Sequence, residues 1–165
     1  MKKILAILLI LVSTSLSVNA QWFVAGGTNI GYLKNNFQFA LKPSVGYEFN
    51  DRWTVGLGLG MEVISNNVYG YVEPYARFNC WNNDKVFFDV KARAELLFNS
   101  ELIGSQIGLS PSIRIKLNNH WQVYGDVGLF GVEYYDGDWG PAFGVGSVGI
   151  ATGVIFRFLI YKRRK

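Results

Sequence analysis

The residue types on which most catalytic and metal sites depend are almost absent from this chain. Its 165 residues include one histidine, His120, and one cysteine, Cys80. A single cysteine cannot form an internal disulfide, and one cysteine with one histidine does not make a metal-binding cluster. The sequence therefore predicts no metal and no other cofactor.

Helical patterning is absent as well. The chain holds 19 glycines, and these together with its β-branched residues interrupt every helical pattern beyond residue 20. The one long apolar run, residues 4–12, is shorter than the ~20 residues that a membrane-spanning helix needs. The sequence therefore predicts an all-β protein.

The apolar run belongs to a predicted secretory signal peptide, residues 1–20. It follows the basic start Lys2-Lys3 and precedes Val18-Asn19-Ala20, a small-x-small cleavage pattern. Cleavage before Gln21 would lower the formal net charge from +4 to +2. A basic tail at residues 162–165 supplies four of the positive charges in the domain at 21–165. Without the signal peptide and this tail the chain is slightly acidic, so the sequence shows no footprint for nucleic acid.

The dominant pattern in the chain is a strict alternation of apolar and polar or small residues. Between Phe37 and Val63 every second residue is apolar and those between are small or polar, with one break at Asn50-Asp51-Arg52. Period two indicates β-strands with one apolar face. Eight such strands are predicted, at residues 22–33, 37–49, 53–63, 69–80, 86–97, 107–117, 121–132 and 143–158. In the seventh strand, Val123, Val127 and Leu129 are assigned to the apolar face.

The predicted connections differ between the two ends of the strands. At one end they are short and rich in Asn and Asp, as hairpin turns require: residues 50–52, 81–85 and 118–120. At the other end they are residues 34–36, 65–68, 98–106 and 133–142, of which the last two are longer. Short turns opposite longer loops are typical of outer-membrane barrels and predict that the short turns are periplasmic.

Charge is absent from the whole apolar face, on which no Asp, Glu, Lys or Arg falls in any predicted strand. The opposite face is rich in Gly, Ala, Ser and Thr, which suits a narrow lumen. A soluble barrel such as a lipocalin, with its apolar face inward, is the alternative. Aromatic residues gathered at the short-turn end favour a membrane interface instead. The predicted aromatic girdle consists of Trp22, Phe49, Trp53, Trp81, Trp121 and Phe158.

Thirteen charged residues occupy the face predicted to point inward. Seven are positive and six negative: Lys42, Arg77, Lys91, Arg93, Arg114, Lys116, Arg157, Glu48, Glu62, Glu73, Asp89, Glu95 and Asp126. The interior of an eight-stranded barrel is just wide enough for side chains to fill. The balanced signs favour a packed network of ion pairs, and a narrow ion-conducting channel is the alternative.

Several of these features resemble one known family. The signal peptide, the eight alternating strands and the closing segment Gly153-Val154-Ile155-Phe156-Arg157-Phe158 resemble the small OmpA/OmpX-like outer-membrane barrels, a porin-like β-barrel domain. The resemblance implies an eight-stranded antiparallel up-and-down transmembrane β-barrel. It also implies a monomer in the outer membrane, in contact with lipid and lipopolysaccharide and inserted by the barrel-assembly machinery, which would read the terminal aromatic-x-aromatic signal.

The expected function is a structural or general surface role without catalysis. His120 lies in a predicted periplasmic turn, so the serines predicted at the outer end have no histidine base. Adhesion or ligand capture by the outer loops is an alternative, because Tyr134, Tyr135 and Trp139 make the fourth loop aromatic.

Overall fold

The fold is given by a computed structural model that describes residues 21–33, 36–64, 67–99, 101–135, 137–144 and 150–158. Within these ranges the chain forms strands and turns and no helix. The strands are β1 (Gln21–Leu33), β2 (Asn36–Leu41), β3 (Ser44–Glu48), β4 (Trp53–Ile64), β5 (Asn67–Asn82), β6 (Val86–Asn99), β7 (Glu101–Lys116), β8 (Trp121–Val127), β9 (Leu129–Tyr135), β10 (Asp138–Gly144) and β11 (Ile150–Arg157). The predicted signal peptide and basic tail lie outside the described residues.

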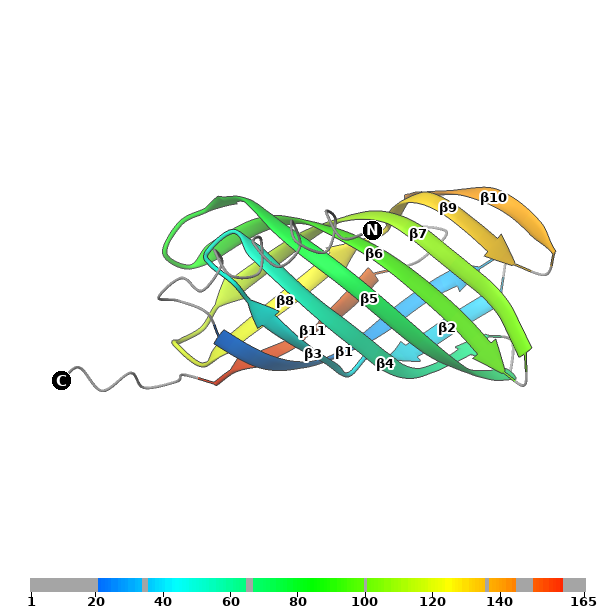
Figure 1. The fold of residues 1–165 in the computed structure, drawn as a ribbon, viewed down its shortest axis with the longest axis horizontal. Coiled ribbons are helices and arrows are strands. Elements are labelled where there is room, and N and C mark those ends of the chain that lie inside the picture. Colours follow the sequence, from blue (N-terminus) through cyan, green and yellow to red (C-terminus); the bar gives the residue numbers. More distant parts are fainter. Residues whose placement is uncertain are drawn as a thin grey trace, which may run out of the picture.

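These elements form the eight wall strands of one closed antiparallel barrel. Each wall strand, whether continuous or divided into two elements, is called a stave. Three staves are interrupted: β2 and β3 flank Lys42-Pro43, β8 and β9 flank Gly128, and β10 and β11 flank residues 145–149. Consecutive staves pair with each other, and β1 pairs with β11 from Phe23↔Arg157 to Ile30↔Ile150, which closes the wall. The strands cross the barrel obliquely (Figure 1). The predicted eight-stranded antiparallel barrel, with its first and last strands paired, is confirmed.

The barrel wall has its apolar face outward and its charged face inward, which is the reverse of a water-soluble barrel. Side chains alternate across a strand, so one set points out and the next points in. Leu59 and Met61 on the outer face are 50% and 58% exposed, whereas Glu62 next to them is 0% exposed. The outer face is thus apolar and the charged residues are buried inside.

One residue of the seventh stave lies on the opposite face from that predicted. Leu129 was assigned outward with Val127, but it is fully buried, and Phe130 and Val132 are exposed instead. Gly128 between them has a φ of 65°, a left-handed conformation that interrupts the strand and shifts the alternation by one residue. The assignment of Leu129 to the outer face is therefore wrong.

A second irregularity lies near the turn between β5 and β6. Asn79 pairs with Asp89 and Trp81 with Phe88, so Cys80 is an extra residue in β5. The bulge leaves both Cys80 and Trp81 exposed on the outer face. It thereby places the Trp81 ring beside Phe88, with centroids 5.4 Å apart.

The longer loops predicted at the other end of the barrel are wrong. Residues 98–106 continue the β6–β7 pairing as far as Asn99↔Glu101. Residues 133–142 continue the β9–β10 pairing as far as Tyr135↔Asp138. The end carrying the β9–β10 hairpin is therefore built of extended hairpins, and Tyr134, Tyr135 and Trp139 lie in strands (Figure 1).

Candidate functional site

The candidate site is the lumen of the barrel, where the thirteen inward charges meet. Eleven of them are at most 8% exposed, and Lys116 and Arg157 are half-buried. They come from seven staves, and each is the inward residue of a local alternation. Because ions confined at this depth are costly unless they are paired, the partners of each charge decide what the lumen can do.

Inward glycines make room for aromatic rings in the lumen. A Cβ atom at Gly56 or Gly60 would overlap the rings of Tyr75 and Tyr71, and one at Gly27 would overlap the hydroxyl of Tyr124. The rings therefore lie directly against the backbone of the opposing strands. The glycines on the inward face, which lie among its charged residues, therefore leave the space that the tyrosine rings occupy.

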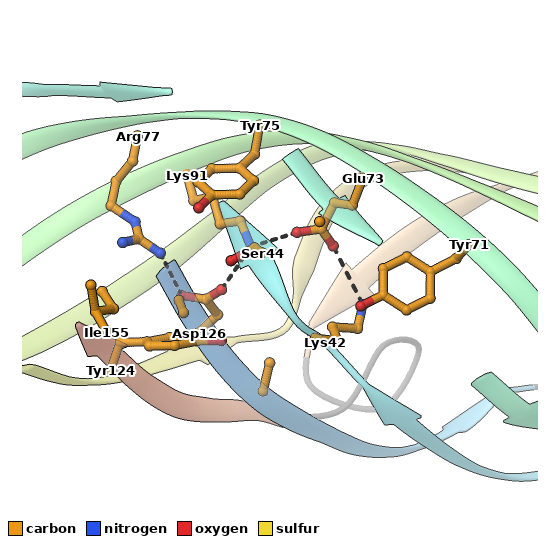
Figure 2. Close-up of a pocket in the computed structure, with 13 residues that line it drawn as sticks. Lys42, Ser44, Tyr71, Glu73, Tyr75, Arg77, Lys91, Tyr124, Asp126 and Ile155 are labelled. Carbon is orange, nitrogen blue, oxygen red and sulfur yellow. Dashed lines mark hydrogen bonds and ion pairs between the residues drawn. The ribbon is translucent and has the colours of Figure 1, made fainter. Parts of the chain in front are cut away.

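Glu73 on β5 is the centre of the ion-pair network (Figure 2). Its two oxygens accept hydrogen bonds from Lys91 Nζ at 2.6 Å, from Arg93 at 3.2 Å and from Lys42 Nζ at 3.3 Å. Lys42 also donates to Glu95 at 2.6 Å. One carboxylate thus holds three cations from two other staves, Lys91 and Arg93 on β6 and Lys42 between β2 and β3.

Asp126 on β8 is the second acceptor at this level. It accepts from Lys91 Nζ at 3.0 Å and from the Ser112 hydroxyl at 2.6 Å, and Arg77 lies 3.8 Å away. Lys91 therefore bridges Glu73 and Asp126 across the lumen (Figure 2). The Lys91 ammonium also lies 4.6 Å from the centre of the Tyr75 ring, a cation–π contact.

A separate cluster of charges lies in the lumen near the short turns. The Arg114 guanidinium pairs with Asp89 through two nitrogens and donates to Glu48 at 3.1 Å. Arg157 donates to the same Glu48 oxygen at 2.6 Å. With its amide oxygen facing Arg157, Gln122 accepts from both terminal nitrogens of that guanidinium at 3.0 and 2.9 Å.

Little space remains at the centre of the lumen. The cavity at the level of Glu73 and Asp126 holds about 20 Å³, which is room for about one water molecule. Towards the end carrying the β9–β10 hairpin, Leu97 and Leu129 are buried as well. The lumen is thus filled by side chains at its centre.

The sequence did not single out the neutral members of the network. Three buried neutral side chains each hydrogen-bond to a charged one: Ser112 to Asp126, Asn79 to Asp89, and Gln122 to Arg157. The rings of Tyr71, Tyr75 and Tyr124 also lie in the lumen. Each is an inward residue of the alternating pattern, so the pattern places them in the lumen. The hydrogen-bond partners of these residues depend on the register between neighbouring strands. The sequence of a single strand does not determine that register.

The predicted girdle residues lie at the turn end on the outer face. All four tryptophans are about half exposed, with Phe158 similarly exposed and Phe49 half-buried. Further aromatic residues fill the spaces between them: Tyr47 contacts Trp22 at 5.1 Å and Phe156 contacts Trp121 at 4.8 Å between ring centroids. The side chains of this rim are aromatic around much of the barrel.

Outside the lumen, few groups suggest chemistry. His120 is exposed in the last turn, stacked on Phe156. Among the described residues no three His, Cys, Asp or Glu side chains gather as a metal site would require. No helix in the described part of the chain is long and apolar enough to span a membrane. The chain matches no protein-family model, and no curated protein shows significant similarity to it.

Proposed function

We propose that this protein is an integral outer-membrane barrel with a structural or general surface role and no catalytic activity. The observation that carries the proposal is the inverted wall: a charge-free apolar exterior around a buried ionic interior. In water such an exterior would be a very large exposed hydrophobic patch, whereas in a bilayer it is the expected lipid-facing surface. A closed barrel also leaves no unpaired strand edge in the hydrocarbon.

The aromatic rim supports the orientation proposed from the sequence. Tryptophan and tyrosine are enriched where lipid tails meet water. The rim at the turn end would therefore lie at the periplasmic interface, with the hairpin β9–β10 on the outer side among lipopolysaccharide. Export through the predicted signal peptide, insertion by the barrel-assembly machinery and a monomeric state complete the proposal.

Cell fractionation tests the location. The full chain, produced in a Gram-negative host, should be recovered in the outer-membrane fraction, resist extraction by carbonate, and migrate faster on gels when unheated than when boiled. Recovery in the soluble periplasm would refute the membrane assignment, and recovery as carbonate-extractable protein would refute integral insertion.

The filled lumen favours a plugged barrel over a channel. Nine ion pairs connect the lumen charges among the described residues, and the central cavity has room for about one water molecule. Purified protein in a planar bilayer should give no steady conductance. Reproducible conductance steps of one size, absent from a mock purification, would replace the plug with a channel.

Adhesion is the second candidate, because of one exposed aromatic pair. Trp139 on β10 is 68% exposed and packs against Tyr134 on β9, with centroids 5.1 Å apart. The pair lies on the β9–β10 hairpin, which pairs through β9 with β7, whereas β11 pairs with β1 (Figure 1). Replacing both residues with alanine should leave heat-modifiable mobility unchanged. If cell or matrix binding by the wild type is then also unchanged, this candidate is excluded.

A further inference from the structure

The lumen opens into a polar vestibule at the turn end of the barrel. The vestibule encloses about 280 Å³, and its charged wall consists of Glu48, Asp51, Arg114, Lys116 and Arg157. The central cavity holds about 20 Å³ on the same measure, so the vestibule admits several water molecules where the centre admits about one. It is therefore large enough for a small hydrated ion, in contrast to the centre of the lumen.

Most of the charges in the vestibule neutralise one another. Arg114 is paired with Asp89 below the vestibule, and Arg157 is paired with Glu48 at 2.6 Å. Asp51 lies in an exposed turn, where water screens its charge. Carboxylates thus balance the positive charges of both arginines. Among the described residues, one cation in the vestibule wall has no ion pair.

That cation is Lys116, the last residue of β7. Its side chain is half-buried and belongs to the inward face, since its neighbours Ile115 and Leu117 are exposed on the outer face. None of the nine ion pairs among the described residues includes Lys116. A bound anion would supply the counter-ion that the Lys116 ammonium lacks among the described residues.

We propose that the vestibule binds a small soluble oxyanion, a phosphate or carboxylate group, on Lys116 with Arg157 beside it. Charge-assisted hydrogen bonds from an ammonium are strong contacts for such anions, whereas the terminal nitrogens of Arg157 already donate to Glu48 and Gln122. A lipid headgroup would have to leave the interface and enter the lumen, because Lys116 points away from the apolar exterior. The inference needs only the barrel and is independent of the proposed membrane role.

The test is a titration of the purified full chain in detergent micelles with inorganic phosphate, at an ionic strength held constant with sodium chloride. Amide chemical shifts should saturate at Lys116 and at Arg157, its neighbour in the vestibule. Lys116→Gln should weaken binding about tenfold or more, since a hydrogen bond to a charged group contributes about that factor. Asp51→Asn should change binding by less than about twofold, because water screens that exposed carboxylate.

Matched controls separate the site from a general charge effect. Lys85 is an exposed lysine at the same end that does not line the vestibule, so Lys85→Gln should bind phosphate as the wild type does. Lys116→Arg should restore most of the affinity and shows that loss in Lys116→Gln is not misfolding. Equal binding by Lys116→Gln and wild type, equal losses in both glutamine variants, or shifts confined to the basic tail at 162–165 would overturn the proposal.

A lipid arm distinguishes the two sources of phosphate. Phosphate affinity should be the same in nanodiscs of phosphatidylcholine and of phosphatidylglycerol. If phosphatidylglycerol abolishes phosphate binding, a headgroup occupies the vestibule and the assignment to a soluble anion is wrong.

Discussion

Neutralising Glu73 tests whether the lumen is a dry ionic core. The substitution Glu73→Gln keeps the shape of the side chain and removes the charge that holds Lys42, Lys91 and Arg93. Removing one partner of a buried ion pair costs ~3–5 kcal/mol. Two of the three cations keep a second carboxylate, Glu95 for Lys42 and Asp126 for Lys91, so the lower part of that range, ~3 kcal/mol, is expected.

The loss should be measured by urea unfolding in phospholipid vesicles, followed by tryptophan fluorescence. Asp84→Asn provides the control, because Asp84 is exposed in a turn and its loss should change stability by less than ~0.5 kcal/mol. The double variant Glu73→Gln with Lys91→Met should be more stable than the sum of its single changes, by ~0.5–3 kcal/mol. A loss below ~1 kcal/mol in Glu73→Gln would mean that water screens the network, and the reasoning from a dry lumen would fail.

Four further substitutions, of which Gly26→Ala is a control, test the wall itself by the same unfolding measurement. Leu59→Arg, in the middle of the half-exposed outer face, should cost ~2–4 kcal/mol in vesicles, and a change near zero would place that face in water. Gly56→Ala should cost ~1–3 kcal/mol because its Cβ would overlap the Tyr75 ring, whereas Gly26→Ala meets open space and should be tolerated; equal effects would contradict the ring packing. Gly128→Ala should cost ~1–2 kcal/mol because φ is 65° there, and a neutral result would mean that the strand accommodates an ordinary conformation.

Alternation made the assignment of faces possible from the sequence. The inward and outward sets follow from the period of two, which is a property of one strand and needs no knowledge of its neighbours. In β4 this holds from Trp53 to Met61 without an exception. The strand count followed for the same reason, because each break in the alternation carries turn residues such as Asn50, whose side chain accepts hydrogen bonds from the Arg52 and Trp53 amides.

Irregular backbone limited the prediction. A glycine is compatible with both ordinary strand and left-handed conformations, so Gly128 gave no sign that it would shift Leu129 inward. The end with the β9–β10 hairpin was misjudged because its polar residues are typical of loops, yet pairing between β6 and β7 continues there to Asn99. Strand pairing can extend into a polar sequence when both neighbours remain aligned, and that alignment is a tertiary property.

The sequence by itself determined that the charges share one face and that the tryptophans gather at one end, since both follow from position along a strand. Only the tertiary structure decided which charges meet. Lys42 and Glu95 are 53 residues apart and form an ion pair at 2.6 Å. Lys116 takes part in none of the ion pairs among the described residues. The stagger between neighbouring staves sets these distances, because in a closed barrel it decides which inward residues lie at the same height.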